Sequence, residues 1–306
     1  MIDNKRVFHG LILFAFALMV VIVLLSAYMR LSNAGLGCED WPDCYGRNLS
    51  GYISVHPGWM TALHRVAASL MSMALIALAL LAWRRRREFP GRFPRVLMLF
   101  GFTVFLALLG KLAPSPLLPI VVLGNMLAGL GMLVLLWRLH LDCTMGRAPL
   151  SRPSARMVLG IGLLVMQIVL GGMVSANFAA LGCTSLLSCD GWQQGLTLAG
   201  FNPLQSLSVE QGSKFVSGAA QQAIHMTHRL FAPVVFIYLS WLGVRLLREK
   251  LRGHGQLLLV VLALQALLGI CSVVHELPLF LVLMHNATAA CLLLILVTIS
   301  YRTRKV

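Results

Sequence analysis

The chain has 306 residues, of which 58% are hydrophobic and only 11% are charged, and its mean hydropathy is +0.84. Such a composition cannot supply the polar surface of a soluble domain, which excludes soluble enzymes and soluble binding modules. The formal net charge of +15 does not indicate nucleic-acid binding, because the basic residues form short clusters between apolar runs, as in the cytoplasmic loops of membrane proteins.

Eight apolar segments, each close to the ~20 residues that span a bilayer, predict eight transmembrane helices. In chain order they cover approximately 8–30, 59–83, 96–113, 117–139, 157–178, 222–245, 255–274 and 278–300. The first segment is long enough to span and lacks a clear cleavage site, so we expect it to be retained. Because backbone groups in hydrocarbon must be bonded internally, the predicted fold class is an all-α integral membrane protein within the lipid bilayer.

The basic residues predict how these helices are oriented. Most of the 25 Lys and Arg residues fall on one side of the predicted helices. They lie at 5–6, 84–95, 138–156, 245–252 and 302–305. Both termini are therefore expected to be cytoplasmic, and the long links 31–58 and 179–221 to be outside, which in bacteria is the periplasmic face of the inner membrane.

The two long outer links resemble each other. The first carries "GLGCEDWPDCYG" and the second carries "ALGCTSLLSCDG", and "ALLG" recurs at 107–110 and 266–269. This self-similarity predicts a tandem repeat of two four-helix units, 1–150 and 151–306. Each unit has an even number of helices, so the two predicted bundles are pseudo-symmetric about an axis along the membrane normal.

Each outer link holds two cysteines six residues apart, Cys38 with Cys44 and Cys183 with Cys189. The outer compartment is oxidising, so each pair is expected to form a disulfide. A zinc site is the alternative, but this spacing without adjacent histidines fits zinc poorly. The spacing does not decide whether the disulfides are structural or redox-active.

Three histidines are predicted at a similar depth, roughly 8–11 Å below the outer surface, on the second, sixth and eighth helices. They are His64, His228 and His285. Two imidazoles that face each other across a bundle can hold a haem iron from both sides. Aligning "VLGN" with "VLMH" places Asn125 opposite His64, so the first unit offers one such ligand at most.

Arg65 and Arg229 directly follow two of these histidines, and His225 precedes His228 by three residues. An arginine at this depth needs a partner, and haem propionates or lipid headgroups would both serve. His225 lies on nearly the same helix face as His228. It could support that histidine, carry protons or satisfy an interfacial group, and we favour support.

Five stretches carry a resemblance to a known family: "GLGCEDWPDCYG", "HPGWMTALHR", "LLVMQIVLGGMVSANFAALGC", "AIHMTHRL" and "QALLGICSVVHELPLFLVLMHNATAACLLL". Together they resemble the haem A synthase family in its proteobacterial form, over nearly the whole chain and more closely in the second half. The resemblance implies an oxidoreductase that converts haem O, its substrate, to haem A by oxidising a ring methyl to a formyl group. It also implies that haem b is the cofactor.

The resemblance assigns roles to particular residues. It implies that His228 and His285 ligate haem b, with Arg229 and His225 in support. The substrate pair maps onto His64 and position 125, where this chain has Asn125 in place of histidine.

Two further features of the substrate half follow from the resemblance. The family's acidic residue, three positions before the first histidine, is replaced by Thr61. The cysteine pair of the first link is kept as Cys38 and Cys44.

The leading hypothesis is therefore a haem A synthase, with haem O synthase and cytochrome c oxidase assembly as expected partners and homo-oligomer formation left open. The alternative is a non-catalytic haem b-binding membrane protein, a haem chaperone or redox module for oxidase assembly, which Thr61 and Asn125 favour. A quinol-linked haem b electron carrier does not explain the cysteine links. A transporter is disfavoured because the predicted intramembrane charges lie near one face.

Overall fold

The computed structural model describes residues 4–33, 58–88, 91–112, 118–146, 153–183, 185–186, 189–204 and 218–303. Across these ranges, eight helices are long and apolar enough to cross a membrane. They are α1 (Asn4–Asn33), α2 (Gly58–Arg84), α3 (Phe93–Leu112), α4 (Pro119–Thr144), α5 (Ala155–Ala176), α6 (Ala219–Leu247), α7 (Arg252–Val274) and α8 (Leu279–Thr303). A short 3₁₀ helix, η2 (Trp192–Gly195), lies in the link before α6.

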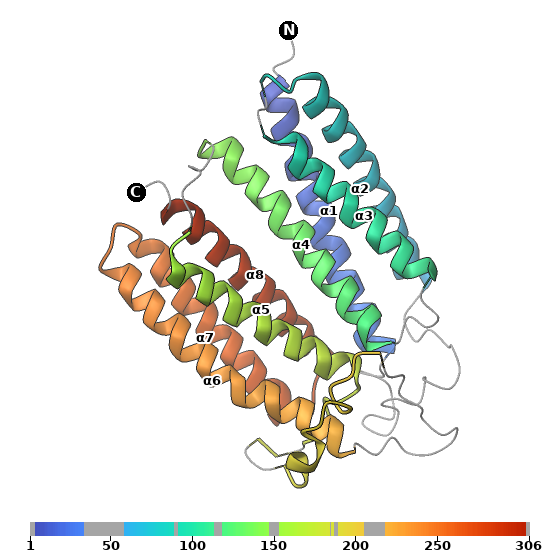
Figure 1. Cartoon of the computed structure of the whole chain (residues 1–306), viewed down its shortest axis with the longest axis vertical. Helices are drawn as coiled ribbons and strands as arrows, with labels where there is room; N and C mark the ends of the chain where they lie inside the picture. Colours follow the sequence, from blue (N-terminus) through green and yellow to red (C-terminus); the bar gives the residue numbers. More distant parts are fainter. Residues whose placement is uncertain are drawn as a thin grey trace.

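The helices run up and down along one common direction, and both chain ends lie at the same end of the molecule (Figure 1). We call this the terminal end and the opposite one the link end. Helices α1 to α4 lie beside one another on one side, and α5 to α8 on the other. The two groups meet where α4 and α1 contact α8 and where α4 contacts α5.

Two buried apolar clusters fill the interior. The first is formed by α1 to α4 around Leu75 and Leu136, and the second by α5 to α8 around Leu239 and Leu296. Ala290 of α8 belongs to the first cluster, so the two groups of helices share packing across their junction. The apolar stripes that form these clusters recur every three to four residues, as expected for helices with one buried face.

The outer surface of the bundle is apolar. Met73, Ile237, Val260 and Phe280 are each 65–68% exposed, and each lies within a predicted membrane span. Such exposure is unfavourable in water but favourable against lipid. The prediction of an all-α, multi-pass membrane protein is confirmed.

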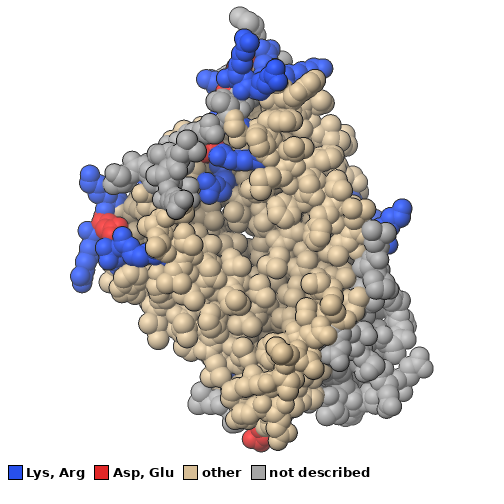
Figure 2. Space-filling model, in the orientation of Figure 1, with Lys and Arg blue, Asp and Glu red and all other residues tan. Residues whose placement is uncertain are grey.

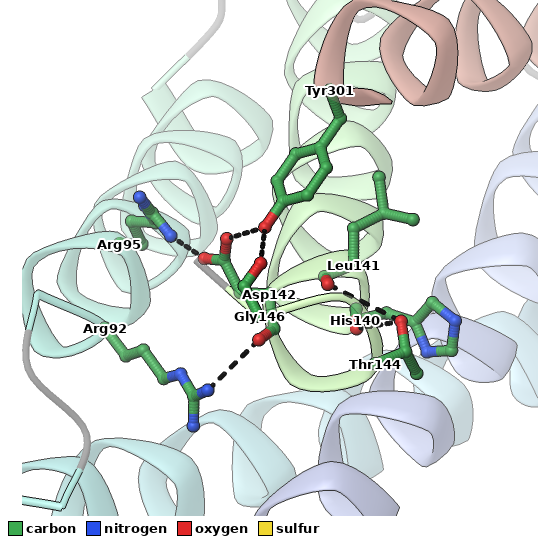
Figure 3. A network of polar contacts seen from close by, with 8 residues as sticks. All are labelled: Arg92, Arg95, His140, Leu141, Asp142, Thr144, Gly146 and Tyr301. Atoms are coloured by element: carbon green, nitrogen blue, oxygen red, sulfur yellow. Dashed lines mark hydrogen bonds and ion pairs between the residues drawn. The ribbon is translucent and has the colours of Figure 1, made fainter. Parts of the chain in front are cut away.

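A polar network ties three helices together at the terminal end (Figure 3). Asp142 of α4 is buried, and its carboxylate forms an ion pair with Arg95 of α3. The hydroxyl of Tyr301 on α8 lies 2.6 Å from both Oδ1 of Asp142 and the carbonyl of Gly146. Arg92 adds a hydrogen bond to the carbonyl of Asp142 at 3.3 Å. These partners explain why α4 continues past the predicted end at residue 139, because the polar residues of its last turn are satisfied inside the protein.

The link between α5 and α6 reaches across the junction at the link end. The amide of Ile120, in the first turn of α4, donates to the carbonyl of Pro203 at 2.9 Å. This bond satisfies one of the amides that a helix N-terminus leaves without an intrahelical partner. The second outer link therefore caps a helix of the first group.

Candidate functional site

A cavity of about 1510 Å³ lies between the two groups of helices, toward the link end. All eight membrane helices contribute to its lining, which is mostly apolar. Its volume exceeds the roughly 300–1,000 Å³ of ordinary small-molecule pockets. Its polar lining includes His64, Asn125, Gln167, His228, Gln265 and His285.

His285 of α8 is held from two sides by one residue of α7. Its Nδ1 lies 3.2 Å from the carbonyl oxygen of Gln265, and its Nε2 lies 3.2 Å from the side-chain amide nitrogen of the same glutamine. A carbonyl only accepts and an amide N–H only donates. Both contacts therefore assign the proton to Nδ1 and the lone pair to Nε2, where it accepts from the Gln265 amide; a metal ligated at Nε2 would displace that amide.

The ring of His285 also lies against a glycine of α7. A methyl group added at Gly269 would come within 3.0 Å of Cε1 of the imidazole. The close approach of ring and backbone is possible only because this position has no side chain. The rotation of the ring is thus limited by the surface of α7.

His228 of α6 also lies against a glycine, on α5, but no glutamine side chain bonds to its ring among the described residues. A methyl group added at Gly171 would come within 3.0 Å of its Cε1, and the amide of Gln167 donates to its backbone carbonyl at 3.1 Å. The Nδ1 atom of His228 is buried without a hydrogen-bond partner. His228 and His285 line the same cavity.

Arg229 is engaged by the link that follows α5. Its Nη1 donates to the carbonyls of Ser185 and Leu186 at 2.6 and 3.3 Å, and its Nη2 donates to that of Cys183 at 2.8 Å. Its Nε donates to Nε2 of His225, which is buried. Four of the five guanidinium N–H groups are therefore used, and one on Nη2 remains for a further acceptor.

The link held by Arg229 contains the predicted disulfide between Cys183 and Cys189, whose Cα atoms lie 5.1 Å apart. That prediction is confirmed. The other predicted pair, Cys38 and Cys44, lies outside the described residues.

The first group of helices also contributes polar residues to the cavity. His64 is half-buried and lines it, and Arg65 and Asn125 are exposed and line it as well. Thr61 is not among the lining residues; its hydroxyl points at the sulfur of Met29, 4.0 Å away. The structure therefore brings His64 and Asn125 to the cavity and directs Thr61 toward α1.

Met126 is packed against α5. A methyl group added at Gly172 would collide with the terminal methyl of Met126 and would come within 3.2 Å of its sulfur. The same position would meet Leu123 at 2.7 Å. The thioether of Met126 thus fills the junction between α4 and α5.

Sequence reasoning missed Gln167, Gly171, Gln265 and Gly269. A signal for them was present, because "QIVLG" and "QALLG" place Gln and Gly four residues apart on the two helices that precede the histidine helices. Residues at this spacing share one helix face. A glutamine amide within an apolar helix also requires a partner.

The arrangement suits a metal ion that is held within a larger non-protein group, because the protein then needs to supply only one or two ligands. Within the described ranges, no group of three His, Cys, Asp or Glu side chains could hold a bare metal ion. A haem supplies four equatorial nitrogens and needs only axial ligands, which two neutral imidazoles can provide. His228 and His285 are the pair that the sequence predicts for this role, and both line the cavity.

Known proteins are similar to this chain over most of its length. A model of the cytochrome oxidase assembly protein family matches residues 9–297. A Heme A synthase of Shewanella oneidensis is 34% identical over 307 aligned residues, which cover 92% of each chain. A Heme A synthase of Bacillus pumilus is 25% identical and covers 90% of this chain and 88% of its own. The chain belongs to the cytochrome oxidase assembly protein family.

Proposed function

We propose that the chain is a haem A synthase of a bacterial inner membrane. This oxidoreductase converts the ring methyl of haem O to the formyl group of haem A for cytochrome c oxidase assembly. The observation that carries the proposal is the pair His228 and His285, which line one cavity in a chain with full-length similarity to proteins of that name. The same similarity supports an enzyme over a non-catalytic haem-binding protein.

The residues of the second half fit a haem b cofactor. The carbonyl of Gln265 keeps the proton of His285 on Nδ1, so Nε2 carries the lone pair, and an iron bound there would replace the hydrogen bond from the Gln265 amide; glycines lie beneath both imidazoles. The lining is mainly apolar, which suits the faces of a porphyrin and excludes water. His228 and His285 would hold the iron, and the remaining N–H of Arg229 is available to a propionate.

The first half is proposed to receive haem O through His64. Asn125 is a poor ligand for haem iron, so the opposite axial position is left without a strong protein ligand. A haem iron with one open axial position supplies oxygen-dependent oxidation chemistry. Arg65 would pair with a propionate of this haem, a role that its exposed position in the cavity lining supports.

We further propose that residues 1–150 form the substrate half and 151–306 the cofactor half. The separate apolar clusters of α1 to α4 and α5 to α8 support this division. Lys and Arg gather at the terminal end (Figure 2), which supports cytoplasmic termini and a periplasmic disulfide link. Haem O synthase is the partner that would supply the substrate.

The test is to express the chain in a bacterial host that makes haem O but lacks its own haem A synthase. Extracted haems are then separated by chromatography. Haem A in the extract is the expected result. Bound haem b with unchanged haem O would contradict the enzyme and would support the non-catalytic haem-binding alternative.

The ligand assignment is tested separately with His228→Ala and His285→Ala. Each variant is expected to lose the low-spin haem b spectrum, because one of two axial ligands is removed. His275→Ala is the matched control, since His275 is exposed at the end of α7 and does not line the cavity. A spectrum that survives both cavity substitutions would sink the assignment.

A further inference from the structure

Arg30 lies in the last turn of α1, at the link end, and lines the cavity. Its Nε is buried and has no hydrogen-bond partner. Within the described part of the chain, this guanidinium forms neither a hydrogen bond nor an ion pair. A charged side chain inside a membrane bundle normally meets a counter-charge or backbone carbonyls. The guanidinium of Arg30 is therefore available to a bound ligand.

Arg229 shows how an arginine at this cavity is satisfied when the protein supplies the partners. Its guanidinium donates to three carbonyls of the link after α5 and to Nε2 of His225. Aligning "GLGC" with "ALGC" places Arg30 opposite Ser175, so the second half has no arginine at the matching position. Arg30 is thus particular to the first half, and none of the contacts among the described residues explains its charge.

The cavity carries an excess of positive charge. Its described lining includes Arg30, Arg65 and Arg229, and none of these described lining residues is Asp or Glu. Positive charge within a mostly apolar wall attracts anionic groups, because water screens it poorly there. A carboxylate suits a guanidinium best, since the planar fork of N–H donors matches its two oxygens. The charge and the lining together fit a large apolar molecule that carries carboxylates.

Arg30 lies about one helix turn closer to the link end than His64. The hydroxyl of Thr61 on α2 points at the sulfur of Met29 on α1, so the two helices lie side by side at this level. His64 lies three residues further into α2, and Arg30 lies one residue further toward the end of α1. One turn is about 5.4 Å along the helix axis. A porphyrin whose metal is bound at His64 therefore presents an edge to Arg30.

We propose that Arg30 is a positioning residue that binds a propionate of the haem in the first half. This inference rests on the proposed function, because it assumes that His64 ligates that haem. With its carboxylates held near the link end, the porphyrin directs its opposite, apolar edge into the bundle. Arg30 thereby fixes the rotation of the ring about its axial ligand, and this rotation decides which ring methyl faces which part of the cavity.

The proposal has a consequence for stability. A charge without a partner in an apolar bundle destabilises the protein that carries it, and a ligand carboxylate offsets this cost. Replacing Arg30 leaves no described protein group without its partner, in contrast to replacing Asp142, which Arg95 and Tyr301 share. The porphyrin-free protein should therefore be no less stable when Arg30 is replaced, although porphyrin binding is weakened.

The experiment uses the full-length protein in detergent, purified from a host that makes no haem O. The probe is zinc protoporphyrin IX, because a zinc porphyrin takes one axial ligand and its fluorescence reports binding. Its dimethyl ester has the same ring, but both carboxylates are uncharged. Dissociation constants of the acid and of the ester are measured for the unmodified protein, Arg30→Gln and Arg30→Lys. The signal that is lost in His64→Ala defines binding in the first half.

Arg30→Gln should weaken binding of the acid about tenfold or more, because a charge-assisted contact to a carboxylate is lost. Binding of the ester should stay within about twofold, so the acid and the ester respond differently to the same substitution. Arg30→Lys keeps the charge without the planar fork and should restore part of the affinity for the acid.

Arg245→Gln is the matched control, because Arg245 forms an exposed ion pair with Glu249 and does not line the cavity. It should leave both dissociation constants unchanged. Thermal unfolding without the probe is measured in parallel. The midpoint for Arg30→Gln should be no lower than that of the unmodified protein, whereas a lower midpoint would assign Arg30 a structural role and overturn the inference.

Equal losses of affinity for the acid and the ester in Arg30→Gln would also overturn the inference. So would an unchanged affinity for both probes together with the loss of a co-purifying anionic phospholipid, because Arg30 would then bind a lipid headgroup. Each of these results leaves the proposed function intact. Zinc protoporphyrin IX that binds His64→Ala as tightly as the unmodified protein would instead contradict the haem site of the first half, and the role of Arg30 with it.

Discussion

Arg229 donates a hydrogen bond from its Nε to Nε2 of His225 over 3.1 Å, one helix turn away on α6. Its remaining bonds go to carbonyls of the disulfide link, at Cys183, Ser185 and Leu186. A single side chain therefore joins His225, three residues before His228, with the disulfide link. Leu186 and Arg229 both line that cavity.

Arg229→Gln should loosen this link. Three charge-assisted hydrogen bonds are lost, each worth about 1.5–3 kcal/mol when the donor is charged, less where solvent screens it. We expect the Cys183–Cys189 disulfide to be reduced about tenfold faster by dithiothreitol, because reduction requires access to the bond. Maleimide labelling followed by mass spectrometry measures the rate.

The control for that variant is Arg245→Gln. Arg245 forms an exposed ion pair with Glu249 at the terminal end of α6, far from the link. Its loss should leave the reduction rate unchanged. Equal rates for Arg229→Gln and Arg245→Gln would show that Arg229 does not protect the disulfide.

Removing the disulfide by Cys183→Ser with Cys189→Ser should lower the stability of the link end. Chain-entropy arguments give about 2 kcal/mol for a cross-link between residues six apart. The midpoint of thermal unfolding should fall, as measured by intrinsic fluorescence. Cys143→Ser changes a free thiol on α4 and serves as the comparison. A double substitution as stable as this control would argue that the link is held by Arg229 alone.

Asp142→Ala should destabilise the protein without altering the haem site. Asp142 is 2% exposed, and its removal leaves Arg95 and Tyr301 without their shared partner. Breaking a buried pair in this way costs about 3–5 kcal/mol. The exposed ion pair of Arg245 and Glu249 provides the contrast. Glu249→Ala should lower the stability by no more than ~1 kcal/mol. Denaturant or thermal unfolding in detergent measures the loss of stability in Asp142→Ala and in Glu249→Ala. Comparable losses of stability in the two variants would contradict the structural role of Asp142.

Asn125→His should give the first half a second axial ligand. Position 125 is exposed to the cavity, and Gly110, which matches Gly269 in the repeat, has nothing within 4 Å of an added methyl group. The expected result is a haem-to-protein ratio close to two with a second low-spin signal. A ratio unchanged from the unmodified protein would mean that this half does not hold haem through His64.

Thr61→Glu tests the other position of the substrate half at which this chain differs from the family pattern, where the family has an acidic residue. The side chain of Thr61 does not line the cavity but points at Met29, which does, so a longer carboxylate at this position would start beside the cavity wall. We expect Thr61→Glu with Asn125→His to raise the yield of haem A in the host described above. Lower yield in the double variant would show that this chain works with Thr61 and Asn125 as they are.

Much of the fold followed from local properties of the sequence. The eight spans were predicted because a bilayer sets both the length and the apolar character of each helix, whatever its neighbours are. The disulfide between Cys183 and Cys189 followed from spacing and compartment. The end of α4 did not, because Asp142 and His140 read as polar loop residues until Tyr301, Arg95 and His9 are placed beside them.

The sequence by itself determined the helices and their order, and it identified His64, His228 and His285 as candidate ligands. Hydropathy and residue type are properties of a single segment, so these features need no knowledge of the packing. Only the tertiary structure decided which partners those residues meet. Gln265 reaches both nitrogens of His285, and Met126 turns against α5, because the rotation of each helix is set by packing across the bundle. Contacts between residues of different helices depend on that rotation, which no single segment specifies.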